Sequence, residues 1–278
     1  MITRFLLFSL LLACSLTNAQ VFIKNVQVID VENKKILPGY NVLVMDGKII
    51  SVDKRTYKLP EGTSVVDGTG KYLMPGLVDA HVHFFQDGGL HARPDAIDLR
   101  KIRPYSEEIR WTHQHMEQLL RMYTSAGITS VIDVGASRNL LKQRDTFATK
   151  TYAPIISMTG PLLTTYVPPA FRDLAQDDAA FVLMTTTDSV RMQVHDQQTA
   201  GADFVKIWYI VQGTDTEKAA RSTLPLVQAA IDQAHKLNMR VAVHATQRIS
   251  AQLAVEAGAD FLVHSVDDEV VSREFIQL

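Results

Sequence analysis

Short runs in which hydrophobic and polar residues alternate fill the chain between residues 20 and 73. Such alternation, bounded by turn residues, is typical of β-strands whose two faces meet different surroundings. The runs predict strands over 21–31, 40–45, 48–52, 63–67 and 71–73. Asp46-Gly47 stands between two of these runs and is a strong signal for a tight hairpin turn. The pattern therefore predicts a small β unit over residues 20–73.

From residue 74 the chain alternates between apolar runs and stretches with the 3.6-residue period of an amphipathic helix. The apolar runs predict strands over 77–83, 128–134, 154–158, 204–209, 240–245 and 261–265. The periodic stretches predict helices over 106–126, 187–200, 217–237 and 247–257. Strands that alternate with helices through short connections run parallel, so we expect six βα units of a doubly wound sheet or a (β/α) barrel. No glycine-rich phosphate loop follows any of these strands, which disfavours a nucleotide-binding sheet.

The first residues have the features of a secretory signal. Arg4 precedes an apolar run over 5–13, which is shorter than the roughly 20 residues that a membrane span needs. Small residues at Thr17 and Ala19 then predict a signal peptide over 1–19, cleaved before Gln20, and a secreted or periplasmic protein. The alternative is a lipoprotein attached through Cys14, which is disfavoured because the bulky Leu12 occupies a position where a smaller residue is usual.

Composition narrows the function classes. A chain with 46% hydrophobic and 21% charged residues is typical of a folded globular protein. The net charge of −2 and the lack of any Lys/Arg-rich run argue against a nucleic-acid partner, and no stable membrane insertion is expected. The single cysteine provides neither a disulfide framework nor a cysteine zinc site. Any metal must therefore be held by His, Asp, Glu or Lys.

Four histidines stand at the ends of predicted strands. His81 and His83 are two residues apart, a spacing that places both side chains on one face of a strand. His244 and His264 close two later apolar runs. Each alone is more often a core histidine, but the carboxyl ends of parallel strands converge, and clustered imidazoles favour a divalent metal. We therefore expect the four to form one metal-binding site.

Lys206 lies inside the apolar run 204–209. A buried amine that stays charged and unpaired costs several kcal/mol, which favours a functional role. The alternative is a lysine that extends its methylene groups along the strand to reach solvent.

The segment 74–83, with the sequence MPGLVDAHVH, resembles the first-strand signature of the amidohydrolase superfamily. The chain from Val21 onward resembles its imidazolonepropionase-related branch, which includes metal-dependent Xaa-Pro dipeptidases. This resemblance implies an α/β fold with a metal-bearing (β/α)8 TIM-like barrel, of which about six βα units are present here. Residues 20–73 would then be the N-terminal part of a β-sandwich domain, and 74–278 an incomplete barrel.

The resemblance also implies a metal centre. Two divalent metal ions are expected, zinc being favoured, although histidine and carboxylate ligands suit several metals. His81 and His83 would hold the more buried ion and His244 and His264 the second, with Lys206, carboxylated on its amine, between them. The implied catalytic residues are Lys206, His244 and His264. The implied reaction is hydrolysis of an amide-type C–N bond in a small molecule, a dipeptide or a cyclic amide, by a metal-bridging hydroxide.

One feature of that family is missing. Its members carry an aspartate at the end of an eighth strand, whereas this sequence stops at Leu278, where the helix after the sixth strand is expected. Asp267 and Asp268 follow His264 too closely to replace it. We therefore expect this chain to be an inactive, C-terminally truncated fragment. The alternatives are a mononuclear deaminase or cyclic amidase of the same superfamily, or a non-catalytic remnant; a homo-oligomer is compatible with each.

Other polar residues are weaker candidates. Four of them could contact substrate: His91, Arg93, Tyr166 and Tyr209. For His91 and Arg93, a solvated loop is the more ordinary interpretation. Asp79 shares a face with His81 but lies deeper in the strand, which predicts a structural hydrogen bond. His113 and His115 lie on a predicted helix, where positions two apart do not face each other, so we do not expect them to be ligands.

Export can be tested directly. The mature protein should begin at Gln20 when its N-terminus is sequenced. An intact Met1 would contradict cleavage, and a lipid-modified Cys14 would replace the secreted form with the lipoprotein alternative.

Overall fold

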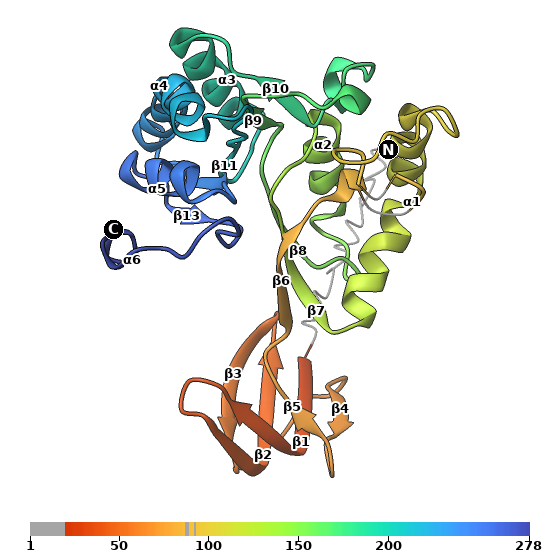
Figure 1. Cartoon of the computed structure of the whole chain (residues 1–278). Coiled ribbons are helices and arrows are strands. Elements are labelled where there is room, and N and C mark those ends of the chain that lie inside the picture. Colours follow the sequence, from red (N-terminus) through yellow and green to blue (C-terminus); the bar gives the residue numbers. More distant parts are fainter. Residues whose placement is uncertain (1–19, 87–88, 92) are drawn as a thin grey trace, which may run out of the picture. The chain divides into compact units, whose positions relative to one another are not determined.

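The computed structural model describes residues 20–86, 89–91 and 93–278 (Figure 1). The chain divides into two compact units between Pro75 and Gly76. The predicted signal peptide, including Arg4 and Cys14, lies outside the described residues. Within the described ranges, no helix combines the length and the apolar character needed to cross a membrane.

The N-terminal unit is a five-stranded sheet with the order β3-β2-β1-β4, in which β5 also pairs with β1. Its strands are β1 (Gln20–Asp30), β2 (Lys35–Met45), β3 (Lys48–Asp53), β4 (Ser64–Asp67) and β5 (Tyr72–Leu73). The hairpin between β2 and β3 turns at Asp46 and Gly47, whose φ angles of 51° and 74° are the positive values that a two-residue hairpin requires. β2 begins at Lys35, before the predicted residue 40, because Lys35 and Leu37 continue the antiparallel ladder with β1.

The second unit is α/β with parallel strands, as predicted. The six predicted strands correspond to β6 (Leu77–Val82), β7 (Ile128–Asp133), β8 (Ile155–Met158), β11 (Val205–Trp208), β12 (Val241–His244) and β13 (Phe261–Leu262). Two short strands were not predicted, β9 (Leu162–Thr164) and β10 (Phe181–Leu183). The strands form a β6-β7-β8 sheet and a β10-β9-β11-β12-β13 sheet, and a parallel bridge from Thr159 to Phe204 joins the two. The described strands thus form two sheets and do not close into one barrel.

Helices cover these sheets (Figure 1). The longer ones are α1 (Tyr105–Ser125), α2 (Arg138–Phe147), α3 (Thr187–Thr199), α4 (Thr216–Lys236) and α5 (Arg248–Glu256), with a short α6 (Arg273–Gln277). Three single-turn 3₁₀ helices are η1 (Phe84–Gln86), η2 (Pro169–Phe171) and η3 (Gln176–Asp178). All four predicted helices are present, whereas α2 was not predicted. The side chain of Ser137 caps α2 by accepting a hydrogen bond from the Leu140 N–H.

Two apolar cores hold the strand ends in place. One packs β11 and β12 against α4 and α5 and contains the fully buried Ile207 and Val243. The other packs β6 and β7 against α1 and α2 and contains Leu120 and Val131. The carboxyl ends of strands from both sheets are therefore fixed by packing on the helices behind them.

Ile207→Ala should destabilise the protein by about 2–5 kcal/mol, because it opens a cavity in a core that cannot collapse fully. Ile155→Ala is a matched control, since that side chain is 74% exposed on β8, and it should change stability by no more than about 0.5 kcal/mol. Urea unfolding followed by circular dichroism measures both. Equal destabilisation by the two substitutions would contradict this description of the core.

Candidate functional site

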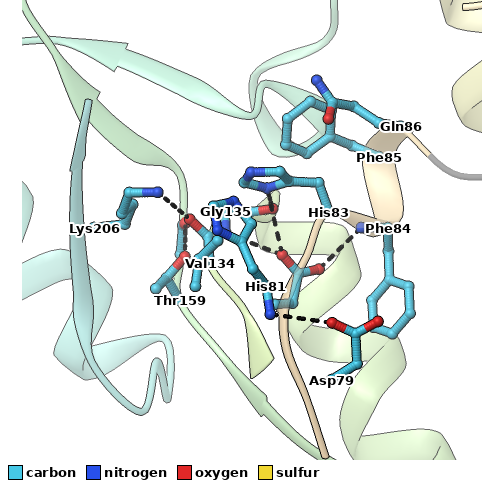
Figure 2. Close-up of polar contacts among 12 residues, drawn as sticks. Asp79, His81, His83, Phe84, Phe85, Gln86, Val134, Gly135, Thr159 and Lys206 are labelled. Atoms are coloured by element: carbon cyan, nitrogen blue, oxygen red, sulfur yellow. Dashed lines mark hydrogen bonds and ion pairs between the residues drawn. The ribbon is translucent and has the colours of Figure 1, made fainter. Parts of the chain in front are cut away.

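His81 and His83 lie at the carboxyl end of β6 (Figure 2). Their ring centroids are 5.2 Å apart in an edge-to-face arrangement. Nδ1 of His83 is 3.3 Å from the carbonyl oxygen of Gly135, to which its N–H donates in the corresponding tautomer. In that tautomer Nε2 carries the lone pair, so the hydrogen bond to the β7–α2 loop leaves Nε2 as the ring nitrogen with acceptor capacity.

His244 and His264 complete a chain of ring contacts. His244 is the last residue of β12, and His264 follows β13. The ring centroids of these two are 4.3 Å apart, and those of His81 and His264 are 4.7 Å apart. The structure therefore brings together the four histidines that the sequence placed at strand ends.

All four histidines and Lys206 line one cavity of about 500 Å³. Its wall also includes apolar and aromatic side chains, among them Phe85, Leu162 and Trp208. The Trp208 ring lies edge to face with His244, at a centroid distance of 5.7 Å. The cavity thus combines several polar groups with an apolar wall, as small-molecule sites commonly do.

Lys206 is buried to 1% exposure on β11. Its Nζ donates a hydrogen bond to the carbonyl oxygen of Val134 at 3.4 Å (Figure 2). Burial lowers the pKa of the amine to about 7, although the carboxylate of Asp133 opposes this shift. Near pH 7 the charged and neutral amines are therefore both populated.

Burial also keeps the imidazoles neutral. It lowers the pKa of His81, and that of His83 falls well below its ordinary value. Burial, with like charges close by, lowers the pKa of His244 to about 3 and that of His264 to about 4. The positive charges of Lys206 and Arg93 contribute to the last two shifts. At neutral pH all four rings are in the form that binds a metal.

Asp133 was missed by the sequence analysis. It is fully buried at the end of β7, where its carboxylate accepts the N–H of Phe84 at 3.2 Å and that of Gly135 at 2.9 Å. The carboxylate is also 3.9 Å from Nδ1 of His83. Asp133 therefore fixes the backbone on both sides of that histidine. The signal was present, because Asp133 is the one charged residue in the predicted strand 128–134.

Gly135 makes this arrangement possible. A Cβ atom at this position would lie 2.5 Å from Leu162 and 2.9 Å from the His83 ring. Only glycine lets the backbone approach the imidazole closely enough to accept its hydrogen bond.

Some of the weaker candidates line the cavity and others do not. Asp79 accepts the backbone N–H of His81 at 3.2 Å, as expected of a structural anchor, and Arg93 lines the cavity. His91 is buried, with Nε2 2.8 Å from the carbonyl oxygen of Arg103, so the expectation of a mouth or solvated-loop residue is wrong. Loop burial depends on tertiary contacts that the local sequence does not show.

Four other candidates do not line the cavity. The Tyr209 hydroxyl donates to the carbonyl oxygen of Ala220 at 2.6 Å, and Tyr166 lies apart from the cavity wall. His113 contacts Gln143 and Asp178, while His115 is stacked on Trp111. The sequence makes the two tyrosines weak candidates and disfavours the two histidines as ligands, and none of the four lines the cavity.

The donor set suits a divalent cation in its chemistry. Neutral imidazoles are ligands for zinc and related metals, and an amine can be converted to a carboxylate donor. However, among the side chains that the structure describes, no three His, Cys, Asp or Glu are already arranged around a single metal position. The structure therefore shows suitable donors gathered in one cavity rather than a preformed ligand cage.

The sequence profile of the Amidohydrolase family matches residues 72–271. A 65-residue segment is 37% identical to an adenine deaminase of Desulforamulus reducens, covering 23% of this chain and 10% of that protein. A 51-residue segment is 47% identical to a dihydroorotase of Streptococcus pneumoniae, covering 18% of this chain and 12% of that protein. The fold resembles that of a prolidase complexed with N-methylphosphonate-L-proline, with a TM-score of 0.70 and 23% identity.

This structural match covers 90% of the chain but 62% of the prolidase, so the chain spans less than two thirds of that protein. The profile match, in contrast, takes in most of the chain, from β5 to beyond β13, and includes every histidine of the cavity. The chain therefore belongs to the amidohydrolase family.

Proposed function

We propose that the cavity is the site of a metal-dependent hydrolase that cleaves an amide-type C–N bond in a dipeptide or a cyclic amide. The observation that carries this proposal is the meeting of His81, His83, Lys206, His244 and His264, from four separate strands, in one cavity. Family membership supports it, as do the names of the three similar proteins, because an adenine deaminase, a dihydroorotase and a prolidase all act at C–N bonds.

In this proposal two divalent cations, zinc being favoured, occupy the cavity. His81 and His83 would hold one cation and His244 and His264 the other, with Lys206 between the pairs. When bound, such a pair of cations supplies Lewis-acid polarisation of the scissile carbonyl and activation of water. The neutral state of the four imidazoles supports this assignment, because protonated rings could not act as ligands.

Lys206 would take part as its carbamate. A neutral amine attacks CO2, a C–N bond forms and one proton is released, which turns the side chain into a carboxylate. Two observations support this: the amine is buried beside the histidines, and the hydrogen bond to Val134 is a long one. A carboxylate at this position would provide a bidentate anionic ligand, and its negative charge would be neutralised by the cations.

The chain's own residues would orient the donors and exclude water. The carbonyl of Gly135 selects the His83 tautomer, and Asp133 holds that loop against Phe84. Phe85, Leu162 and Phe181 form an apolar wall, which strengthens the electrostatic interactions inside the cavity.

A mononuclear deaminase or cyclic amidase is the second candidate, favoured by the similarity to an adenine deaminase. Lys206 argues against it, because a single cation has no need of a bridging carboxylate. The two candidates differ in metal content, which is about two ions per chain for the first and one for the second.

We also propose that the protein is secreted or periplasmic, on the basis of the signal features over residues 1–19.

His244→Ala should remove one of about two zinc ions per chain. The reason is that a directly bound ligand should contribute at least as much affinity as the 10–100-fold typical of outer-shell partners. Zinc titration followed by elemental analysis measures this. His113→Ala is the matched control, because that histidine makes hydrogen bonds on a helix outside the cavity, and it should leave zinc content unchanged. Equal zinc content in both variants would contradict the metal site.

Lys206 carboxylation should be visible with ¹³C-labelled CO2. At constant dissolved CO2 the carbamate NMR signal should grow as the pH rises through about 7, since the neutral amine then replaces the charged one. Lys206→Ala should lose this signal and at least one bound zinc ion, and a short carboxylic acid should partly restore the metal. Retention of both ions by Lys206→Ala would rule out a bridging role.

A further inference from the structure

Arg93 and Asp95 line the same cavity as the histidines, in the loop between η1 and α1. Nε of Arg93 donates to Asp95 at 3.0 Å, and Nη2 donates to the other carboxylate oxygen at 2.8 Å. Gln86 also donates to Asp95, at 3.4 Å. The guanidinium is therefore held in place by one of its edges.

Its other edge binds no residue that the structure describes. A guanidinium has five N–H groups in a planar fork, and Asp95 uses only the Nε and Nη2 side. No partner for Nη1 of Arg93 is found among the described residues. The Nη1–Nη2 edge has the geometry that binds a carboxylate through two parallel hydrogen bonds.

Arg100 in the same loop shows the contrast. Asp98 occupies its Nε–Nη2 edge, with both distances 2.9 Å, just as Asp95 does for Arg93. The Nη1 atom of Arg100 is already bound to Asp173 at 2.5 Å, and this arginine does not line the cavity. Of these two matched arginines, the one at the cavity is the one with an unused edge.

The charges of the cavity make this edge the available cationic group. Among the described residues that line the cavity, Lys206 and Arg93 are the only lysine and arginine. Lys206 is fully buried and belongs to the proposed metal centre, whereas the Arg93 side chain is 62% exposed. A ligand that enters from solvent can thus reach Arg93 without displacing a buried group.

We propose that Arg93 is a substrate-binding residue that recognises the free carboxylate of an N-acylated amino acid, the class that includes dipeptides. The carboxylate would pair with the Nη1–Nη2 edge while the amide bond lies toward the histidines. This inference rests on the proposed hydrolase function and narrows its substrate class, since an uncharged cyclic amide gains nothing from Arg93. Asp95 acts as a positioning residue for the guanidinium.

Two ligands that differ in one group test the proposal: N-acetyl-L-alanine and N-acetyl-L-alaninamide. Calorimetric titration of the zinc-loaded full chain should show that the acid binds about 10–100-fold more tightly than the amide, the range expected for hydrogen bonds to a charged group. Arg93→Gln should abolish this preference and leave the affinity for the amide unchanged. Arg100→Gln is the matched control and should retain the preference.

A preference for the acid that survives Arg93→Gln, or equal affinities in the unmodified chain, would overturn the inference. Loss of affinity for both ligands in Arg93→Gln would also overturn it, because an arginine that only holds the loop in place would affect the two ligands alike. Zinc content, measured on every variant, separates this failure from that of the proposed function. If zinc uptake does not depend on His244, the proposed metal site is refuted. The affinities of the acid and the amide, measured without zinc, still test whether Arg93 binds the carboxylate.

Discussion

The burial of the Lys206 amine is the constraint on which the site depends. An amine in the interior must lose its proton or find compensation, since an uncompensated charge costs several kcal/mol. Here the pKa falls to about 7, and the compensation comes from the end of β7, through the Val134 carbonyl and the Asp133 carboxylate. Because Lys206 lies on β11, this one side chain couples the three-stranded sheet to the five-stranded one. Asp133 also fixes the backbone around His83, so the carboxylate that opposes the pKa shift of the lysine helps to position that histidine.

Under the proposed function, the sign of the charge at Lys206 would decide whether the cavity can hold cations. Four neutral imidazoles offer lone pairs but no negative charge, and a protonated lysine would repel a cation. Under the proposed function, a carbamate on Lys206 would reverse that sign. Under the proposed function, Lys206 is therefore the residue whose modification makes occupancy by two cations electrostatically favourable. Arg93, held by Asp95 nearer to solvent, then remains the cationic group that an anionic ligand meets.

Periodicity predicted the elements whose burial pattern is local. The six long apolar runs became strands and the four periodic stretches became helices, because each buries one face or both against a neighbour. β9 and β10 escaped prediction because they are three residues long and exist through pairing with each other and with β11. α2 has only two buried residues, Leu140 and Leu141, and most of its other residues are polar, so its sequence offers little apolar signal. His91 was misjudged for a related reason: its burial is set by contacts with Arg103 and Glu108 that lie further along the chain.

The contrast between features visible in the local sequence and features set by tertiary contacts also applies to the site. Strand ends carry the histidines, and a strand-end position can be recognised in the sequence from one apolar run. Arg93 and Arg100 look equivalent in sequence, since each lies two residues from an aspartate. Only the fold distinguishes them: Asp173, 73 residues further on, binds Nη1 of Arg100, whereas no described residue binds Nη1 of Arg93. Under the proposed function, the strand-end histidines would supply the reaction chemistry, and the substrate class would depend on which loop side chain has an unbound edge at the cavity.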